Sequence, residues 1–404
     1  MDHSNRQWSH LLWISLAELF ALSVWFSGTA VSHQLYVSYH STAVNPVWLT
    51  ISVQIGFILG ALVSSFFALS DRYSAKRLFV ICSLLAGVLN LLLMFMPNAW
   101  LGILMRGLTG ITLAGVYPTA VKILSSHFQK RKGLAIGVLI GALTMGSNLP
   151  HFILFFTSTL DWKVMIEVSS ALAWVAGIVM WLFVADNHQK AAGQAISTKQ
   201  LVRVFRNQPV MLSNFGYFGH MWELYAAWTW LPVFLIANAK SETTGSIVAF
   251  VTIGLFGAVG CVIGGLVADR IGKANLTILA MAVSATCALV IGFTNHTSWW
   301  ITATVAGIWG IFVIADSAQF SASVTDHAEP EYIGTALAFQ MSVGFLITTI
   351  SIYLLPVIVS WVTWRYAFMI LAVGPVFGIV SMSRLKSITS LSSRATWADG
   401  TPRQ

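Results

Sequence analysis

Charged side chains are scarce in this sequence of 404 residues. Asp, Glu, Lys and Arg together make up 9% of it, whereas hydrophobic residues make up 57%. Soluble domains draw about a quarter of their residues from these four charged types, which help to cover the surface. The composition therefore excludes an ordinary soluble protein and indicates a chain embedded in a membrane.

Cysteine is scarce as well. The three cysteines, Cys82, Cys261 and Cys287, lie inside apolar runs and form neither a Cys-x-x-Cys pair nor a metal-ligand spacing. The sequence therefore implies no disulfide framework and no metal site. It also lacks a phosphate-binding loop and a nucleophile elbow. We therefore expect neither an enzyme nor a bound cofactor.

The net charge of +8 at first suggests nucleic acid binding. The distribution of Lys and Arg argues against it, because they cluster in short segments between apolar runs, as cytoplasmic loops do. If the N-terminus is cytoplasmic, only Lys163, Lys240 and Arg365 fall on the outer side, and Arg106 lies within a span. Both termini are therefore predicted to be cytoplasmic.

Long apolar runs dominate the rest of the chain. A membrane-spanning helix needs about 20 apolar residues and is helical because lipid offers no partner to its backbone groups. The first run is too long for a signal-peptide core and is interpreted as a span. Twelve spans are predicted, near residues 10–33, 47–70, 78–96, 99–121, 134–157, 164–185, 209–235, 245–268, 275–294, 299–321, 334–358 and 366–383.

One long hydrophilic stretch, Asp186–Gln208, separates the sixth span from the seventh. It divides the spans into six plus six. The predicted organisation is an N-terminal bundle (1–185), a cytoplasmic connector (186–208), a C-terminal bundle (209–383) and a cytoplasmic tail (384–404).

The two halves also repeat each other in sequence. Glu18-Leu-Phe-Ala matches Glu223-Leu-Tyr-Ala 205 residues later, and in each copy a Trp follows the Ala by four residues. Two further pairs recur at almost the same spacing: Asp71-Arg72 with Asp269-Arg270, and Trp162-Lys163 with Trp364-Arg365. Two six-helix halves of equal topology follow, related by an axis along the membrane normal.

The loop after the eighth span reads Gly265-Leu-Val-Ala-Asp269-Arg270-Ile-Gly272-Lys273. Small residues let two helices approach closely. The aspartate can neutralise a helix N-terminus and the arginine can add a directional ion pair. Such contacts can hold one conformation and release another.

On these motifs the sequence resembles the major facilitator superfamily over essentially its whole length. The loop is similar to the family's signature loop, and the first-half copy keeps Asp71 and Arg72 but has Phe67 and Ser74 where glycines are expected. The resemblance implies an all-α membrane protein with twelve transmembrane helices in two pseudo-symmetric six-helix bundles. It also implies transport of a small solute by alternating access.

Two further motifs bear on coupling. Arg106-Gly-Leu-Thr-Gly110 resembles the family's Arg-x-x-x-Gly motif, which is associated with proton coupling. In the fifth span Gly133, Gly137 and Gly141 recur every four residues, which predicts tight helix packing, but the Gly-Pro pair of the antiporter signature is absent. The resemblance therefore favours a proton-coupled symporter of a small organic solute. An antiporter, a uniporter and a non-transporting receptor or scaffold remain alternatives.

Four charged residues lie well inside spans: Glu18, Glu223, Arg106 and Asp316. A charge at membrane depth costs at least ~2.5–3.5 kcal/mol, so such residues are functional candidates. We predict proton coupling on Glu223, assisted by His220, which is three residues earlier on the same helix face. Histidine is a residue type suited to a proton relay near neutral pH. Solute contact is predicted for Glu18 and Arg106, and a role in gating for Asp316. Hydrogen-bonded packing without a transport role is the alternative for each.

Aromatic residues are dense in the first and seventh spans. Most are expected to serve packing or the membrane interface. Those near Glu223 could instead stack on an organic solute or a cation. The candidates for solute contact are Trp25, Trp222, Tyr225 and Trp230.

One predicted cytoplasmic loop, Thr325–Tyr332, is acidic, whereas its counterpart in the first half, Gln129–Lys132, is basic. An exposed turn is the simpler interpretation, since surface ion pairs contribute little. The alternative is that the loops pair across the halves when the cytoplasmic side closes, joining these residues: Asp326, Glu329 or Glu331 with Lys130, Arg131 or Lys132.

The expected partners are a small-molecule solute, protons and the lipid bilayer, with no nucleic acid. The expected location is the cell (inner) membrane, as a monomer.

Overall fold

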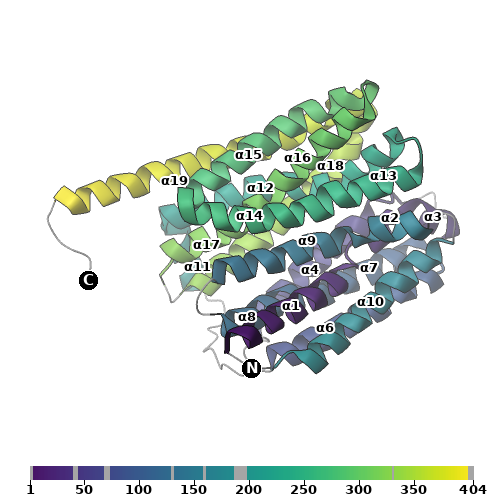
Figure 1. Ribbon diagram of the computed structural model, residues 1–404, viewed down its shortest axis with the longest axis horizontal. Helices are drawn as coiled ribbons and strands as arrows, with labels where there is room; N and C mark the ends of the chain where they lie inside the picture. Colours follow the sequence, from purple (N-terminus) through teal and green to yellow (C-terminus); the bar gives the residue numbers. More distant parts are fainter. Residues whose placement is uncertain are drawn as a thin grey trace.

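The computed structural model describes residues 3–39, 44–67, 73–128, 132–157, 161–185, 198–329 and 332–398. Within these residues every regular element is a helix (Figure 1). The prediction of an all-α membrane protein with twelve transmembrane helices in two six-helix bundles is confirmed.

The first six spans contain these helices, in chain order: α1 (His3–Leu22), α2 (Ser27–Ala30), α3 (Ser32–Ser38), α4 (Trp48–Phe66), α6 (Ala75–Leu92), η1 (Leu93–Phe95), α7 (Ala99–Leu113), α8 (Tyr117–His127), α9 (Lys132–Thr157) and α10 (Trp162–Phe183). Helix α11 (Thr198–Arg206) lies in the predicted connector.

The last six spans contain these helices: α12 (Gln208–Asn238), α13 (Glu242–Ala249), the π-helical turn η2 (Phe250–Leu255), α14 (Phe256–Ile271), α15 (Lys273–Val290), η3 (Ile291–His296), α16 (Trp299–Ala315), α17 (Ser317–His327), α18 (Ile333–Ala367), η4 (Phe368–Ala372) and α19 (Val373–Ala398).

Eight stretches of the described residues are long and apolar enough to cross a membrane. One of them, Ile333–Ser390, holds the last two spans, which separate at Thr363, where φ is 60°. The remaining spans are formed by α1 to α3, by α4 and by α12. Helix α19 continues to Ala398, so the helix extends beyond the predicted end of the last span at residue 383.

The first span is interrupted between α1 and α2, which the sequence did not indicate. The Ser23 hydroxyl donates to the Phe20 carbonyl oxygen at 2.7 Å, and the Ser27 hydroxyl donates to the Val24 carbonyl oxygen at 3.0 Å. Serine side chains that bond nearby backbone groups compete with regular helix hydrogen bonds. The interruption leaves carbonyl groups in the middle of the first half that need other donors.

The fourth and tenth spans are interrupted at corresponding places. The fourth breaks between α7 and α8, where Pro118 in the first turn of α8 has no backbone N–H to continue the helix. The tenth breaks at Asp316, which ends α16 and precedes α17. Each half therefore contains a separate short helix, α8 or α17, after the break.

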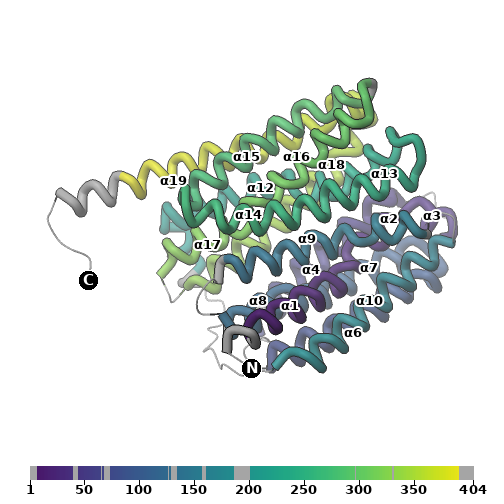
Figure 2. Tube along the Cα trace, viewed as in Figure 1, coloured from purple at the N-terminus to yellow at the C-terminus, as the bar shows by residue number. Residues whose placement is uncertain are grey.

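The two halves lie side by side, the first from purple to blue and the second from teal through green to yellow in Figure 2. Helix α9 of the first half packs closely on α14 of the second. The two backbones are so near that a Cβ atom added at Gly141 would lie only 3.1 Å from the Ala258 carbonyl oxygen. Helix α1 begins and α19 ends at the same end of the bundle, on the left of Figure 1. We call this the terminal end.

Candidate functional site

A cavity of about 560 Å³ lies between the two halves and has the size of a small-molecule site. Helices α1, α4, α8 and α9 line it from the first half, and α12 and α14 to α18 line it from the second. Asp269, Lys273 and Asp326 are the charged side chains among its described lining residues. They lie where α14 ends, where α15 begins and near the end of α17, so the charges sit at the terminal end and the rest of the wall is uncharged.

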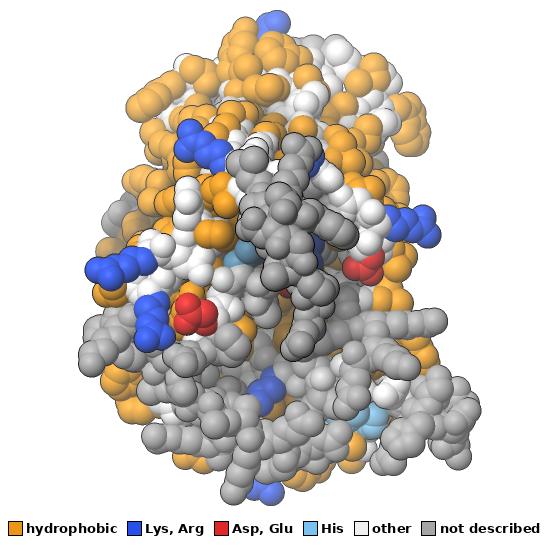
Figure 3. All heavy atoms as spheres, turned by 90° about the vertical axis from the view of Figure 1, so that its left-hand side faces the viewer, with side chains coloured by type: hydrophobic (Ala, Val, Ile, Leu, Met, Phe, Trp, Pro, Cys, Tyr) orange, Lys and Arg blue, Asp and Glu red, His pale blue; other side chains and the backbone are white. Residues whose placement is uncertain are grey.

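The mouth of the cavity carries an ion pair. The Lys273 Nζ atom lies 2.5 Å from the Asp326 Oδ2 atom, and both side chains are partly exposed. Figure 3 looks onto the terminal end and shows Lys and Arg side chains spread over this face. The mouth therefore lies in a charged, water-facing region, in contrast to the deeper wall.

The halves contact each other at the end opposite the terminal end. The rings of Trp48 and Tyr353 lie 6.1 Å apart, and those of Phe152 and Phe250 lie 4.9 Å apart. Each pair joins one half to the other. The cavity is thus closed at this end and extends toward the terminal end.

The deep end of the cavity is an aromatic cluster with Tyr225 at its centre. The Tyr225 ring lies 5.7 Å from Trp25, 5.4 Å from Trp228 and 5.2 Å from Phe345, between ring centroids. Phe57 packs on Phe345 at 4.5 Å. These five residues all line the cavity and come from both halves: from α4, α12, α18 and the break between α1 and α2. The predicted solute contacts Trp25 and Tyr225 thus meet in the cavity wall.

The other two predicted aromatic contacts lie elsewhere. The Trp222 indole N–H donates to the Ile370 carbonyl oxygen at 2.9 Å, and the Trp230 indole N–H donates to the Ile352 carbonyl oxygen at 3.0 Å. Neither tryptophan lines the cavity. Their geometry fits packing between spans.

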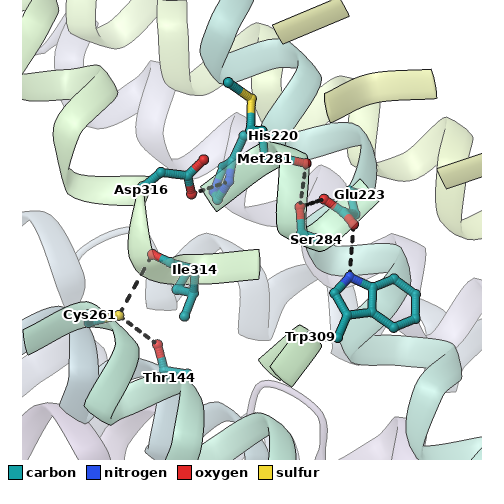
Figure 4. A network of polar contacts seen from close by, with 9 residues as sticks. All are labelled: Thr144, His220, Glu223, Cys261, Met281, Ser284, Trp309, Ile314 and Asp316. Carbon is teal, nitrogen blue, oxygen red and sulfur yellow. Dashed lines mark hydrogen bonds and ion pairs between the residues drawn. The ribbon is translucent and has the colours of Figure 1, made fainter. Parts of the chain in front are cut away.

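Glu223 is buried behind the cavity wall, inside the second half (Figure 4). Its Oε2 atom accepts a hydrogen bond from the Ser284 hydroxyl at 2.8 Å, and its Oε1 atom accepts one from the Trp309 indole N–H at 2.8 Å. Helix α15 supplies the serine and α16 the tryptophan. Both carboxylate oxygens are therefore satisfied by fixed donors, which is the condition for keeping such a group buried.

The Ser284 hydroxyl can serve both protonation states of this carboxyl group. Its oxygen also lies 3.2 Å from the Met281 carbonyl oxygen. When Glu223 is ionised, the hydroxyl donates to the carboxylate. When Glu223 carries a proton, the hydroxyl can donate a hydrogen bond to the Met281 carbonyl oxygen and accept one from the O–H group of the acid, since a hydroxyl both donates and accepts. The site can thus hold or release a proton without leaving a polar group unpaired.

His220 is paired with Asp316 in the structure. Its Nδ1 atom lies 3.0 Å from the Asp316 Oδ1 atom, and both side chains are buried (Figure 4). The donors to Glu223 are Ser284 and Trp309, and His220 contributes none of them. This pair links α12 to the break of the tenth span, at the place where α17 starts to line the cavity.

Glu18, the sequence counterpart of Glu223, has different surroundings. It is fully buried, and among the described residues neither of its carboxyl oxygens has a hydrogen-bond partner. It does not line the cavity, although Leu22, one turn further along α1, does. The two glutamates therefore share a sequence context but not an environment.

Arg106 donates hydrogen bonds to backbone carbonyl groups at the break in the first span. Its guanidinium donates to the Val24 carbonyl oxygen at 2.8 Å, to the Leu49 carbonyl oxygen at 3.2 Å and also to the Trp25 carbonyl oxygen. Carbonyl groups freed by the interruption thus receive donors from a buried cation. No carboxylate of the described residues pairs with Arg106, and it does not line the cavity.

The signature loop is described only in its second-half copy. Gly265 and Asp269 line the cavity. Gly272, between α14 and α15, has φ of 87°, a conformation that glycine adopts without strain. No hydrogen bond or ion pair of the Arg270 side chain is found among the described residues. Asp71 and Arg72 lie outside the described residues.

The acidic loop pairs within the second half and with the connector. Asp326 pairs with Lys273, and the Glu329 Oε2 atom lies 3.8 Å from the Arg203 Nη1 atom of α11. The predicted pairing with the basic loop stays a prediction, because these residues lie outside the described side chains: Lys130, Arg131, Lys132 and Glu331.

Sequence reasoning missed Ser284 and Trp309. Each is a single polar or aromatic residue in an apolar run, so no spacing or repeat singles it out. The half-chain repeat carries a partial signal, because Trp309-Gly310 stands 203 residues after Arg106-Gly107. In the first half the residue at this position, Arg106, donates hydrogen bonds at the break in the first span. In the second half the corresponding residue, Trp309, donates a hydrogen bond to Glu223.

The sequence profile of the Major Facilitator Superfamily matches residues 13–350. The chain belongs to this superfamily. It is therefore a multi-pass membrane transporter of small solutes and not an enzyme. Members of the major facilitator superfamily with solved structures share its fold. The chain is similar to the proton:xylose symporter XylE, with a TM-score of 0.75, 12% identity and coverage of 95% of this chain and 96% of that one.

A nucleoside transporter, NupG, is also similar, with a TM-score of 0.72, 12% identity and coverage of 93% of this chain and 99% of that one. The chain is also similar in sequence to known transporters. A probable sulfoacetate transporter of Cupriavidus necator is 23% identical, and the match covers 54% of this chain and 57% of the relative. A gallate transporter of Pseudomonas putida is 22% identical, and the match covers 72% of each chain.

Proposed function

We propose that the chain is a secondary active transporter that imports a small organic solute together with protons, by alternating access. The cavity between the halves holds the solute, and the Glu223 carboxyl group carries the proton. The observation that carries this proposal is the environment of Glu223, a buried acid with fixed donors beside a hydroxyl that can serve both protonation states. Intramembrane acids of this kind are typical of proton relays.

The separation of proton site and solute site supports coupling through the protein. His220 and Asp316 join α12 to the break before α17, and α12 and α17 both line the cavity. A change in charge at Glu223 or at this pair can therefore bias the position of helices that form the cavity wall. A two-state element that both sites contact is what such coupling requires.

The orientation proposed is that both termini lie in the cytoplasm of a cell (inner) membrane, with the chain acting as a monomer. The excess of Lys and Arg on loops at the terminal end supports it. The cavity then faces the cytoplasm, which corresponds to an inward-facing state. In this arrangement residues 1–185 and 209–383 act as the two moving bundles, and 186–208 connects them.

Flux through reconstituted protein tests the transport function. The solute is first found by a thermal-shift screen of metabolites and drugs, because a ligand bound only by the folded state raises its apparent stability. Its uptake into proteoliposomes is then measured. We expect uptake that saturates with solute concentration and is driven by an inward pH gradient. Binding without any flux would instead indicate a receptor or scaffold.

The signature loop gives a prediction that compares the two halves. Asp269→Asn is expected to slow transport about three- to tenfold more than Asp71→Asn, which corresponds to about 0.7–1.4 kcal/mol of barrier. The reason is that the second-half loop is complete and Asp269 lines the cavity mouth. The measurement is initial uptake at equal membrane abundance of the two variants. Equal rates would contradict the asymmetry.

The acidic loop gives a second prediction. Reversal of charge at Asp326 and Glu329 to Lys is expected to favour the cytoplasm-open state, because it removes the acids that would pair with the basic loop on closure. Labelling of single cysteines from each side of the membrane measures the bias. Lys240→Glu, on the opposite side, is the control. Unchanged labelling on both sides would exclude a gating role for the loop.

A further inference from the structure

Two tryptophans in the cavity wall are exceptional in their hydrogen bonding. Among the described residues, the indole N–H groups of Trp25 and Trp228 are buried and have no acceptor. The N–H groups of Trp174, Trp222 and Trp230 each donate to a backbone carbonyl oxygen at 2.9–3.2 Å. A buried donor without an acceptor is unfavourable, and native proteins keep few of them.

Both donors belong to the aromatic cluster at the deep end of the cavity. Trp25 and Trp228 line the cavity and pack at a tilt against the ring of Tyr225, with ring centroids 5.7 and 5.4 Å away. Each indole ring contacts the Tyr225 ring, and a ligand that enters at these contacts would meet the two buried donors. A flat ring would replace the ring-on-ring contacts by equivalent stacking, which aromatic pairs favour at these distances.

The charge of the ligand follows from the lining. None of the described residues that line the deep end of the cavity is Asp, Glu, Lys, Arg or His, since the charged lining residues sit at the mouth. The Arg106 guanidinium lies behind this wall, where it donates to backbone carbonyl oxygens that include that of Trp25. The oxygens of Glu223, the nearest acid on α12, already accept bonds from Ser284 and Trp309. An anion or a cation at the deep end would lose its hydration without direct contact with a counter-charge, because the Arg106 donors already bind carbonyl oxygens and Arg106 does not line the cavity.

We infer that the aromatic cluster binds an uncharged planar ring that carries a hydrogen-bond acceptor, with Trp25 and Trp228 as its donors. This inference rests on the proposed function and names the class of solute for its cavity. The acceptor, such as a carbonyl oxygen, receives the indole N–H bonds, while Tyr225 and Phe345 stack on the ring. The unpaired donors thus select for an acceptor and the uncharged wall selects against ions.

The test uses ligand-observed NMR to measure dissociation constants of purified full-length protein for simple probes. Benzamide has the ring and the acceptor, cyclohexanecarboxamide has only the acceptor and toluene only the ring, while benzoate and benzylammonium add a charge. We expect benzamide to bind at least about fivefold more tightly than each of the others. Absent benzamide binding, or tighter binding of either ion, would overturn the inference.

Variants separate the hydrogen bond from the ring. Trp25→Phe and Trp228→Phe keep an aromatic ring and remove the N–H, and each is expected to weaken benzamide binding about fivefold while leaving toluene binding unchanged. Trp174→Phe is the matched control, because its N–H donates to Leu84 outside the cavity. Unchanged benzamide affinity in both cavity variants, or an equal loss for benzamide and toluene, would overturn the assignment of the donors.

The outcome for transport is read separately. Benzamide binding without flux of any solute would leave the binding site in place and contradict the proposed function. Solute flux that Trp25→Phe and Trp228→Phe do not alter would leave transport in place and contradict the site.

Discussion

Glu223→Gln is expected to abolish accumulation of solute against its gradient while exchange of solute across the membrane continues. The amide keeps the shape of the side chain and can still accept from Trp309 or Ser284, but it cannot take up or release a proton. Because Glu223 does not line the cavity, the solute should still bind. Transport should therefore become passive.

The magnitude follows from the driving force. With one proton per solute, a gradient of one pH unit supports about tenfold accumulation, since about 1.4 kcal/mol corresponds to a factor of ten. The wild-type protein in liposomes should approach this ratio, and Glu223→Gln should stop at a ratio of one. Glu167→Gln is the matched control, because Glu167 lies exposed on α10. Full proton-driven accumulation by Glu223→Gln would exclude Glu223 as the proton carrier.

Arg106→Met is expected to lower the free energy of unfolding by about 3–5 kcal/mol, because each buried carbonyl group left without a donor costs about 1–3 kcal/mol. Methionine fills much of the volume but donates nothing, so the carbonyl groups of Val24, Trp25 and Leu49 lose the donors that Arg106 supplies. Unpaired carbonyl groups at membrane depth have no water to bond. The segment around the break in the first span should then be the first part of the protein to unfold.

Thermal unfolding of purified protein measures this effect, together with the yield of folded protein after membrane extraction. Arg106→Lys should be intermediate, because an ammonium group has a single nitrogen and cannot span three carbonyl oxygens as a guanidinium does. Arg365→Met is the control, since Arg365 is exposed near the end of α18. A stable Arg106→Met protein that transports solute without proton coupling would contradict this account and would support the coupling role associated with the Arg-x-x-x-Gly motif.

The helices were predictable because apolar runs of about 20 residues have one structural solution in a bilayer. The relation between the halves was readable from the repeat of Glu18 and Glu223 and from the signature loop. The interruption after α1 was not predictable. It involves Ser23 and Ser27, which are common within helices, and it is stable only because Arg106, 82 residues beyond Val24, reaches its carbonyl groups. Such a contact depends on tertiary structure.

The buried acidic residues of the candidate site were predictable from the sequence, but the residues that contact them were not. A carboxylate inside an apolar run stands out, so Glu223 and Asp316 were found from the sequence. The residues that bind them come from other helices, as Ser284 and Trp309 do, and sequence spacing holds no record of that proximity. His220 was expected to assist Glu223 because it lies three residues away on one helix, but its partner in the structure is Asp316.

The direction of proton movement during solute entry tests the central claim most directly. Proteoliposomes containing a trapped pH-sensitive dye are given an inward gradient of the transported solute, with no initial pH difference. Symport through Glu223 predicts that the lumen acidifies as solute enters, and that Glu223→Gln removes the signal while solute still equilibrates. A lumen that becomes alkaline would indicate antiport, an unchanged pH would indicate uniport, and either result would contradict the account.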